Sequence, residues 1–129
     1  MVLELKKDIL SILVVDDDEG IRELFERIFK GESFSLDTAE DGANAIEKVK
    51  AKEYDVAFID IRMPGINGYA AFREIKKISP ALKAVMMTGY SEESIIEACL
   101  KEGAYTCLQK PFFLDSLFWL IEKIKREER

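Results

Sequence analysis

Residues 12–18 read ILVVDDD, and this stretch decides the fold because four apolar residues run directly into three carboxylates. A short, continuously apolar run is typical of a strand that helices cover on both faces. Four more segments with strand character recur along the chain, separated by amphipathic stretches, which is the pattern of βα units around a parallel sheet. We therefore expect five strands, at residues 12–15, 34–39, 56–59, 84–87 and 105–108.

Helices are expected after these strands, because apolar residues recur there at helical spacing. They are predicted at residues 21–29, 43–50, 69–77, 91–101 and 114–124. Ser91 is a suitable N-cap for the fourth of these helices. The second strand, FSLDTA, alternates between apolar and polar residues and should lie at a sheet edge. The fold class is α/β, with a single domain over residues 1–129 and a core over about residues 11–125.

Composition and charge exclude several classes of protein. With 129 residues, 48% of them hydrophobic and 34% charged, the chain has the balance of one folded domain. No apolar run approaches the roughly 20 residues of a membrane span, and the N-terminus lacks a signal-peptide core. We therefore expect a cytoplasmic protein without membrane association. The net charge of −6 argues against direct nucleic-acid binding, which depends on clustered Lys and Arg.

The chain contains no histidine, which narrows its chemistry further. The commonest general base and the commonest metal ligand are therefore missing, as is every nucleophile that a histidine would activate. Any reaction must use carboxylates, Lys, Thr or a partner's residues. The two cysteines, Cys99 and Cys107, form no C-x-x-C pair and are expected to be buried thiols.

Carboxylates stand directly after two predicted strands, where ligands bind in a parallel sheet. Asp16 and Asp17 follow the first strand and Asp60 follows the third, so the three converge if those strands are neighbours. Two unit charges about 4 Å apart repel by roughly 4 kcal/mol at an effective dielectric constant of 20, so such a cluster favours a bound cation. Oxygen ligands with room for water suit Mg²⁺. Asp18 is instead expected to cap the following helix.

The last two strands end in a hydroxyl and an ammonium. Thr88 follows the fourth strand and Lys110 comes just after the fifth. Both groups can hold the equatorial oxygens of a transferring phosphoryl group, while the metal takes another. Because the chain contains neither G-x-x-x-x-G-K-[ST] nor G-x-G-x-x-G, these residues predict a phosphoryl site without a glycine-rich nucleotide loop.

Four motifs in this order and spacing, ILVVDDD, FIDIRMPGINGY, MMTGY and LQKPF, resemble the receiver domain of two-component response regulators over most of the chain. The resemblance implies a flavodoxin-like three-layer sandwich, (βα)5, with the parallel strand order 2-1-3-4-5. It also implies a signalling domain rather than an enzyme. Asp60 would accept a phosphoryl group from a partner histidine kinase or a histidine phosphotransfer protein, because this chain has no histidine.

The resemblance also assigns metal ligands. Asp17 matches a direct Mg²⁺ ligand, and Asp16 matches an acid that holds the metal largely through water. Asp60 and the backbone carbonyl of Arg62 complete the set. The cofactor that the family pattern implies is thus the one that the carboxylates themselves favour.

Thr88 and Lys110 match the residues through which receivers respond to phosphorylation. The Thr88 hydroxyl would follow the phosphoryl group and Lys110 would pair with it, while Lys110–Pro111 matches a cis peptide. The change would reach the face built from the fourth helix, the fifth strand and the fifth helix, and so alter a binding surface.

The chain departs from the family pattern in its fifth strand. Receivers often carry Tyr or Phe three residues before the Lys, where this chain has Cys107. Tyr105, expected to point to the same side of the strand, is a second candidate for the switch, the alternative being an ordinary packed tyrosine. Arg62 and Tyr90 match positions beside the path of the hydrolytic water, so we hypothesise that they slow loss of the phosphoryl group.

A protein partner is expected on the switching face. MMTGY and LQKPF resemble receivers attached to transcriptional activators, so the output is either a downstream protein target or a missing output domain. A phosphorylation-dependent dimer is a further possibility. Trp119 lies off the main apolar stripe of its helix, so partial exposure and packing against the sheet are equal alternatives for it. Ile95, Ile96 and Phe113 are further candidates for partner contact, although packing against the sheet is the favoured alternative for each.

Two alternative functions fit parts of the sequence. Asp16 and Asp18 also match the nucleophile and the general acid of haloacid-dehalogenase-like phosphatases. That match lacks the usual Gly after the second acid and leaves Asp60 without a role. A phosphorylation-independent scaffold with a receiver fold is the other alternative, although all the key positions keep chemically competent residues.

Overall fold

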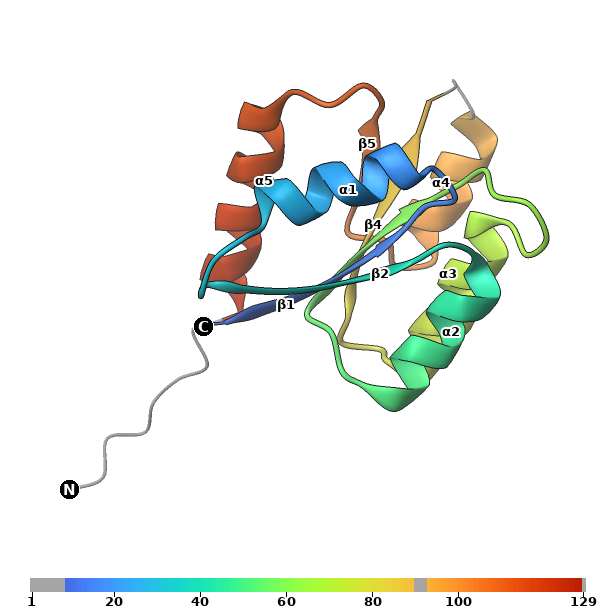
Figure 1. Ribbon diagram of the computed structural model, residues 1–129. Helices are drawn as coiled ribbons and strands as arrows, with labels where there is room; N and C mark the ends of the chain where they lie inside the picture. Colours follow the sequence, from blue (N-terminus) through green and yellow to red (C-terminus); the bar gives the residue numbers. More distant parts are fainter. Residues whose placement is uncertain (1–8, 90–92, 129) are drawn as a thin grey trace.

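The computed structural model describes residues 9–89 and 93–128 as a parallel sheet with helices on both faces (Figure 1). The strand order is β2-β1-β3-β4-β5, and each neighbouring pair is parallel, as expected. β2 lies at an edge, which confirms the prediction from its alternating sequence. The strands are β1 Leu10–Val15, β2 Phe34–Ala39, β3 Val56–Asp60, β4 Lys83–Thr88 and β5 Thr106–Gln109.

A helix follows each strand, as predicted. Asp18, Asp41 and Asn67 start α1, α2 and α3, because each side chain accepts a backbone N–H from the first turn at 2.7 to 2.9 Å. The N-cap role of Asp18 is thereby confirmed, whereas Ser91 lies outside the described residues. None of the described helices is both long and apolar enough to cross a membrane. The helices are α1 Glu19–Ile28, α2 Gly42–Ala51, α3 Gly68–Ile78, α4 Glu93–Lys101 and α5 Leu114–Glu127.

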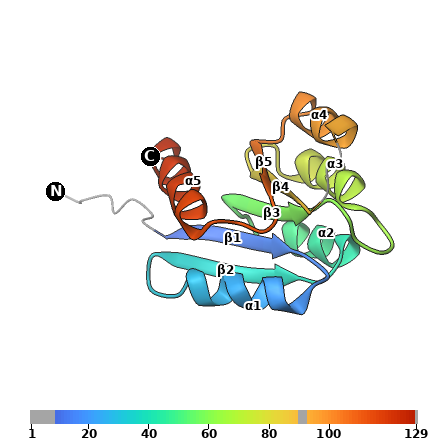
Figure 2. The ribbon, with the colours of Figure 1, turned by 90° about the horizontal axis from the view of Figure 1, so that it is seen from above.

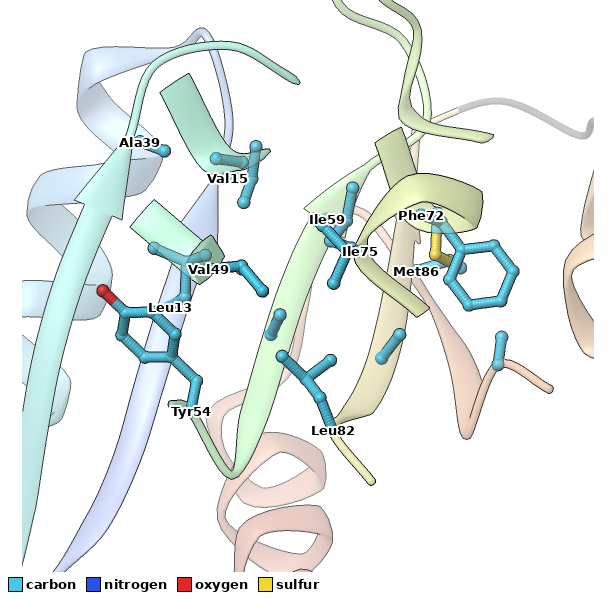
Figure 3. Close-up of a cluster of buried hydrophobic side chains, with 14 of the residues drawn as sticks. Leu13, Val15, Ala39, Val49, Tyr54, Ile59, Phe72, Ile75, Leu82 and Met86 are labelled. Atoms are coloured by element: carbon cyan, nitrogen blue, oxygen red, sulfur yellow. The ribbon is translucent and has the colours of Figure 1, made fainter. Parts of the chain in front are cut away.

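The sheet separates two apolar cores, so the molecule has three layers (Figures 1 and 2). Helices α2, α3 and α4 cover one face, and α1 and α5 cover the other. In β1, Leu13 and Val15 enter the core beneath α2–α4, whereas Ile12 and Val14 enter the core beneath α1 and α5. Burial on both faces explains why this strand is continuously apolar. Figure 3 shows the core beneath α2–α4, with Phe72 of α3 among the strand side chains.

Both cysteines contribute to the core beneath α2–α4. Cys99 of α4 is fully buried, as predicted, whereas Cys107 of β5 is only partly buried because β5 lies at a sheet edge. Burial raises the pKa of Cys99 to about 11 and also raises the pKa of Cys107. Both thiols are therefore protonated near neutral pH and act as packing residues.

Candidate functional site

Three carboxylates meet at the carboxyl ends of β1 and β3. Asp16 and Asp17 follow β1, and Asp60 ends β3. These two strands pair directly, so the side chains at their ends share one edge of the sheet. One carboxylate oxygen from each residue lies within 4.8 Å of the others. Asp16 is fully buried and Asp60 is 6% exposed, whereas Asp17 faces solvent, and the predicted convergence is confirmed.

Lys110 brings a positive charge into this cluster from the loop after β5. Its Nζ lies 2.7 Å from Oδ2 of Asp16 and 3.5 Å from Oδ2 of Asp60. Its backbone N–H donates to the carbonyl of Thr88 at 2.7 Å, which holds the loop at the end of β4. The Lys110–Pro111 peptide is cis, as expected. The buried Thr88 and the partly buried Lys110 are thus joined beside the acidic cluster.

Burial and neighbouring negative charge both make ionisation of Asp60 unfavourable. Burial, followed by the charge of Asp16, raises the pKa of Asp60 from 3.8 to about 6. Lys110 opposes this shift, as does the N–H of Arg62, which donates to Oδ1 of Asp60 at 3.3 Å. Burial alone would lower the pKa of Lys110, but the hydrogen bond and charge of Asp16, with the charge of Asp60, outweigh burial and raise it. Lys110 therefore stays charged, and the cluster still favours a further cation.

Asp16 is held at each of its hydrogen-bonding atoms. Its N–H donates to the carbonyl of Ala39 at 3.1 Å. Its Oδ1 accepts from the N–H of Asp18 at 3.0 Å, and its Oδ2 accepts from Lys110. Its carbonyl accepts from Nη1 of Arg22 at 2.8 Å. The protein thus already engages both carboxylate oxygens of Asp16.

Arg22 is a residue of the site that was not predicted. It lies in the first turn of α1, four residues after the N-cap Asp18. That spacing is a usable signal, because a long side chain in the first turn of a helix can reach back to the end of the preceding strand. The hydrogen bond to Asp16 shows that it does so.

Gly68 sets the position of the Asp60 backbone and was likewise not predicted as part of the site. A Cβ at this residue would lie 2.0 Å from the carbonyl oxygen of Asp60 and 2.6 Å from the Cα of Ile61. The Gly68 N–H donates to the Ile61 carbonyl at 2.9 Å. Only glycine lets the start of α3 pack this closely against the end of β3. A requirement of this kind leaves no sequence signal except the glycine itself.

The model of the response regulator receiver domain family matches residues 12–122 of this chain. The chain belongs to this family. The chain is therefore a receiver, a signalling domain of two-component systems, and its strand order agrees with that of the family.

Curated relatives of this receiver are longer regulators. The DNA-binding transcriptional regulator NtrC of Escherichia coli K12 is 38% identical over 112 residues, which cover 87% of this chain and 24% of NtrC. The transcriptional regulatory protein ZraR of Escherichia coli O157:H7 is 37% identical over 117 residues, which cover 90% of this chain and 26% of ZraR. The receiver thus spans about a quarter of the length of these relatives.

Solved structures agree with the fold of the receiver. NtrX of Brucella abortus matches with a TM-score of 0.84 at 32% identity, covering 92% of this chain and 28% of NtrX. A CheY-like receiver domain protein of Methanospirillum hungatei matches with a TM-score of 0.85 at 27% identity, covering 94% of this chain and 99% of that protein. The flavodoxin-like architecture with strand order 2-1-3-4-5 is confirmed.

In the receiver, Cys107 of β5 and Tyr105, which directly precedes β5, lie on opposite sides of the sheet, so the side expected for Tyr105 is wrong. Cys107 packs against the core beneath α2–α4, whereas Tyr105 packs against the core beneath α1 and α5. Its hydroxyl donates to Oε1 of Glu127 in α5 at 2.8 Å. The physical reason is that β5 begins only at Thr106, so strand alternation does not govern Tyr105. Of these two residues, only Cys107 lies on the side of the sheet that α4 covers.

Arg62 lies beside Asp60, and its predicted roles stay predictions. Its side chain is exposed and borders a groove of about 550 Å³ between the loop after β3 and α4. Its backbone N–H reaches Asp60, as described, and its carbonyl remains a predicted metal ligand. Tyr90, the other residue of the hydrolysis hypothesis, lies outside the described residues.

The apolar candidates for partner contact divide into exposed and packed residues. Trp119 is 62% exposed, which favours exposure over packing, and Phe113 is 79% exposed, against the packing alternative. Ile95 and Ile96 are partly buried against the core beneath α2–α4, which agrees with the alternative that they pack against the sheet. Phe113 and Trp119 therefore offer more accessible apolar surface than the α4 pair.

Proposed function

We propose that this receiver accepts a phosphoryl group on Asp60 from a phosphohistidine of a partner histidine kinase or histidine phosphotransfer protein, with Mg²⁺ as cofactor. The observation that carries the proposal is the meeting of three carboxylates and the ammonium of Lys110 at one sheet edge. A strand-end carboxylate with an ammonium 3.5 Å away suits nucleophilic attack on phosphorus. The histidine must come from the partner, because this chain has none.

The residues at this edge fit a divalent cation. Three carboxylates are close enough to share one ion, and Lys110 offsets only part of their charge. Carboxylate and carbonyl oxygens are the ligands that Mg²⁺ prefers. Asp17, Asp60 and the backbone carbonyl of Arg62 would hold the ion directly, whereas Asp16, whose carboxylate oxygens already accept from Asp18 and Lys110, would hold it largely through water. When bound, it would neutralise charge on the phosphoryl oxygens.

Residues of the chain itself would carry the transfer. A carboxylate oxygen of Asp60 attacks the phosphorus, and the bond from phosphorus to the imidazole nitrogen breaks with its electron pair going to that nitrogen. Lys110, already 3.5 Å from Asp60, pairs with an oxygen of the transferred group. The hydroxyl of Thr88, at the end of the neighbouring strand, donates to another oxygen.

The transferred group would change a binding surface. The hydrogen bond between the Lys110 N–H and the Thr88 carbonyl couples the ends of β4 and β5, so a shift of Thr88 reaches β5 and the helices beside it. The names of the longer relatives support an output in transcriptional regulation, through an output domain or a separate protein target. A phosphorylation-dependent dimer is part of the same proposal. The net charge of −6 argues against direct binding of DNA by this domain.

Incubation with acetyl phosphate and Mg²⁺ tests the proposal. Intact-protein mass spectrometry should show one added phosphoryl group that is absent in EDTA and absent in Asp60→Asn. Asp18→Asn is the matched control, because it removes a carboxylate from the same region while Asn keeps the N-cap, so it should be phosphorylated like the wild type. An adduct that survives in Asp60→Asn, or no adduct at all, contradicts the proposal. Repeated turnover of an aryl phosphate would instead favour the phosphatase alternative.

A further inference from the structure

Asp17 is the exposed member of the acidic cluster, and its carboxylate accepts no hydrogen bond within residues 9–89 and 93–128. No hydrogen bond among these residues orients its side chain, so the backbone of Asp17 sets the point from which that side chain starts. The carbonyl of Asp16 and the Cα of Asp17 lie in one rigid peptide plane. Any contact that fixes this carbonyl also fixes the point from which the Asp17 side chain starts.

Arg22 makes that contact. Its Nη1 donates to the carbonyl oxygen of Asp16 at 2.8 Å, in a partly buried position. Arg22 is itself anchored, because its backbone N–H donates to the carbonyl of Asp18 at 3.2 Å, and Asp18 caps α1. Residues 16–22 thus form a closed ring. The chain runs from the end of β1 through Asp17 into the first turn of α1, and the Arg22 guanidinium reaches back to the Asp16 carbonyl. Asp17 is the member of this ring without a side-chain anchor.

We propose that Arg22 is a positioning residue for Asp17, and through Asp17 for the binding of Mg²⁺. This inference rests on the proposed function, since it concerns the same metal site. Arg22 itself would contact neither the ion nor the phosphoryl group. Its role is to hold the Asp16–Asp17 peptide so that the Asp17 carboxylate is already directed to the cluster before the ion arrives.

The charge of Arg22 acts in the opposite direction from its hydrogen bond. A guanidinium near the site repels a second cation, so a purely electrostatic role predicts tighter Mg²⁺ binding when the charge is removed. A positioning role predicts weaker binding, because ordering of Asp17 must then occur on binding. The sign of the change in affinity therefore separates the two roles.

Arg22→Met tests the inference, because it keeps an aliphatic stem and removes the donors. Isothermal titration with MgCl₂ should show a dissociation constant about tenfold higher than that of the wild type, equal to about 1.4 kcal/mol. Arg22→Lys restores the charge and a donor, and should recover part of the affinity. Arg27→Met, which removes an exposed arginine from the last turn of the same helix, is the matched control and should bind Mg²⁺ like the wild type.

The rate of phosphorylation by acetyl phosphate at varied Mg²⁺ gives a second measurement. In Arg22→Met the half-saturating Mg²⁺ concentration should rise by the same factor, while the plateau rate stays within about twofold of the wild type because excess ion orders Asp17. Unchanged or tighter Mg²⁺ binding in Arg22→Met overturns the inference, whereas a wild type that binds no Mg²⁺ overturns the proposed function. If circular dichroism shows that Arg22→Met does not fold, Arg22→Gln is judged by the same criteria.

Discussion

Asp60→Asn should stabilise the metal-free protein. Burial and the charge of Asp16 raise the pKa of Asp60 from 3.8 to about 6 in the folded state. Near neutral pH this carboxylate is ionised in both the folded and the unfolded protein, but its ionisation is less favourable in the folded one. Asparagine has nearly the same shape and no charge, so the substitution removes that unfavourable term.

The size of the effect follows from the pKa difference. Roughly two pKa units correspond to about 3 kcal/mol, and solvent at the open mouth of the site reduces this, so we expect the free energy of unfolding to rise by about 1 to 2 kcal/mol. The folded wild type binds more protons than the unfolded chain between pH 3.8 and about 6, so the wild type loses stability as the pH rises through that interval. The advantage of Asp60→Asn should therefore vanish below pH 3.8 and be complete above about pH 6.

Urea unfolding followed by circular dichroism measures this advantage. In EDTA near neutral pH, Asp60→Asn should unfold at a higher urea concentration than the wild type with an unchanged slope. Saturating Mg²⁺ should narrow or reverse the difference, because the ion stabilises the folded wild type more than the variant. Asp18→Asn controls for net charge, since it removes an exposed carboxylate from the same region. The electrostatic reasoning is wrong if Asp60→Asn is no more stable than the wild type in EDTA, or if Asp18→Asn raises the free energy of unfolding by as much.

Three further substitutions test other contacts. Gly68→Ala places a methyl group against the end of β3, so urea unfolding should show a free energy of unfolding lower by about 1 to 3 kcal/mol. The same variant should incorporate the phosphoryl group of acetyl phosphate more slowly. Lys110→Met leaves the buried Asp16 carboxylate without its counter-charge, so in EDTA the free energy of unfolding should fall by about 3 kcal/mol. Addition of Mg²⁺ should restore part of this loss in the same unfolding assay. Tyr105→Phe removes the hydrogen bond to Glu127 and should change stability by less than about 1 kcal/mol. A changed phosphorylation rate in Tyr105→Phe would contradict its assignment as a packing residue.

Apolar runs predicted the strands because a strand covered on both faces is buried along its length, as β1 is. The strand bounds were less predictable. β1 begins at Leu10 and β4 at Lys83, because backbone pairing with the neighbouring strands extends beyond each continuous apolar run, through Ser11 in β1 and to Lys83 in β4. The strand order depended on family resemblance, since an apolar run contains no information about which strand pairs with which.

The carboxylates, Thr88 and Lys110 were predictable because their side chains carry the chemistry and follow predicted strands. Arg22 and Gly68 were not, because each acts on the backbone of another residue. Arg22 bonds the carbonyl of Asp16, and Gly68 leaves room for a carbonyl at the end of β3. Contacts of this kind depend on how α1 and α3 pack against the sheet, and sequence periodicity does not specify that packing.

Asp16 and Asp17 are neighbours in the sequence with opposite roles in the structure. Asp16 is buried with a partner at each hydrogen-bonding atom, whereas Asp17 is exposed and its carboxylate has none within the described residues. Asp60 lies between these extremes, since its contacts with Lys110 and the Arg62 N–H, at 3.5 and 3.3 Å, are longer than those of the Asp16 carboxylate.

A site that binds and releases a phosphoryl group needs some side chains held in place and others whose oxygens make only weak hydrogen bonds. Asp16 is the side chain held in place. Asp60 keeps a weakly bonded oxygen available for attack. The pKa of its carboxyl is raised because burial and the charge of Asp16 outweigh the contacts with Lys110 and the Arg62 N–H. Stability and reactivity are therefore opposed at this residue, and for that reason the substitution that should abolish phosphorylation is also the one that should stabilise the metal-free fold.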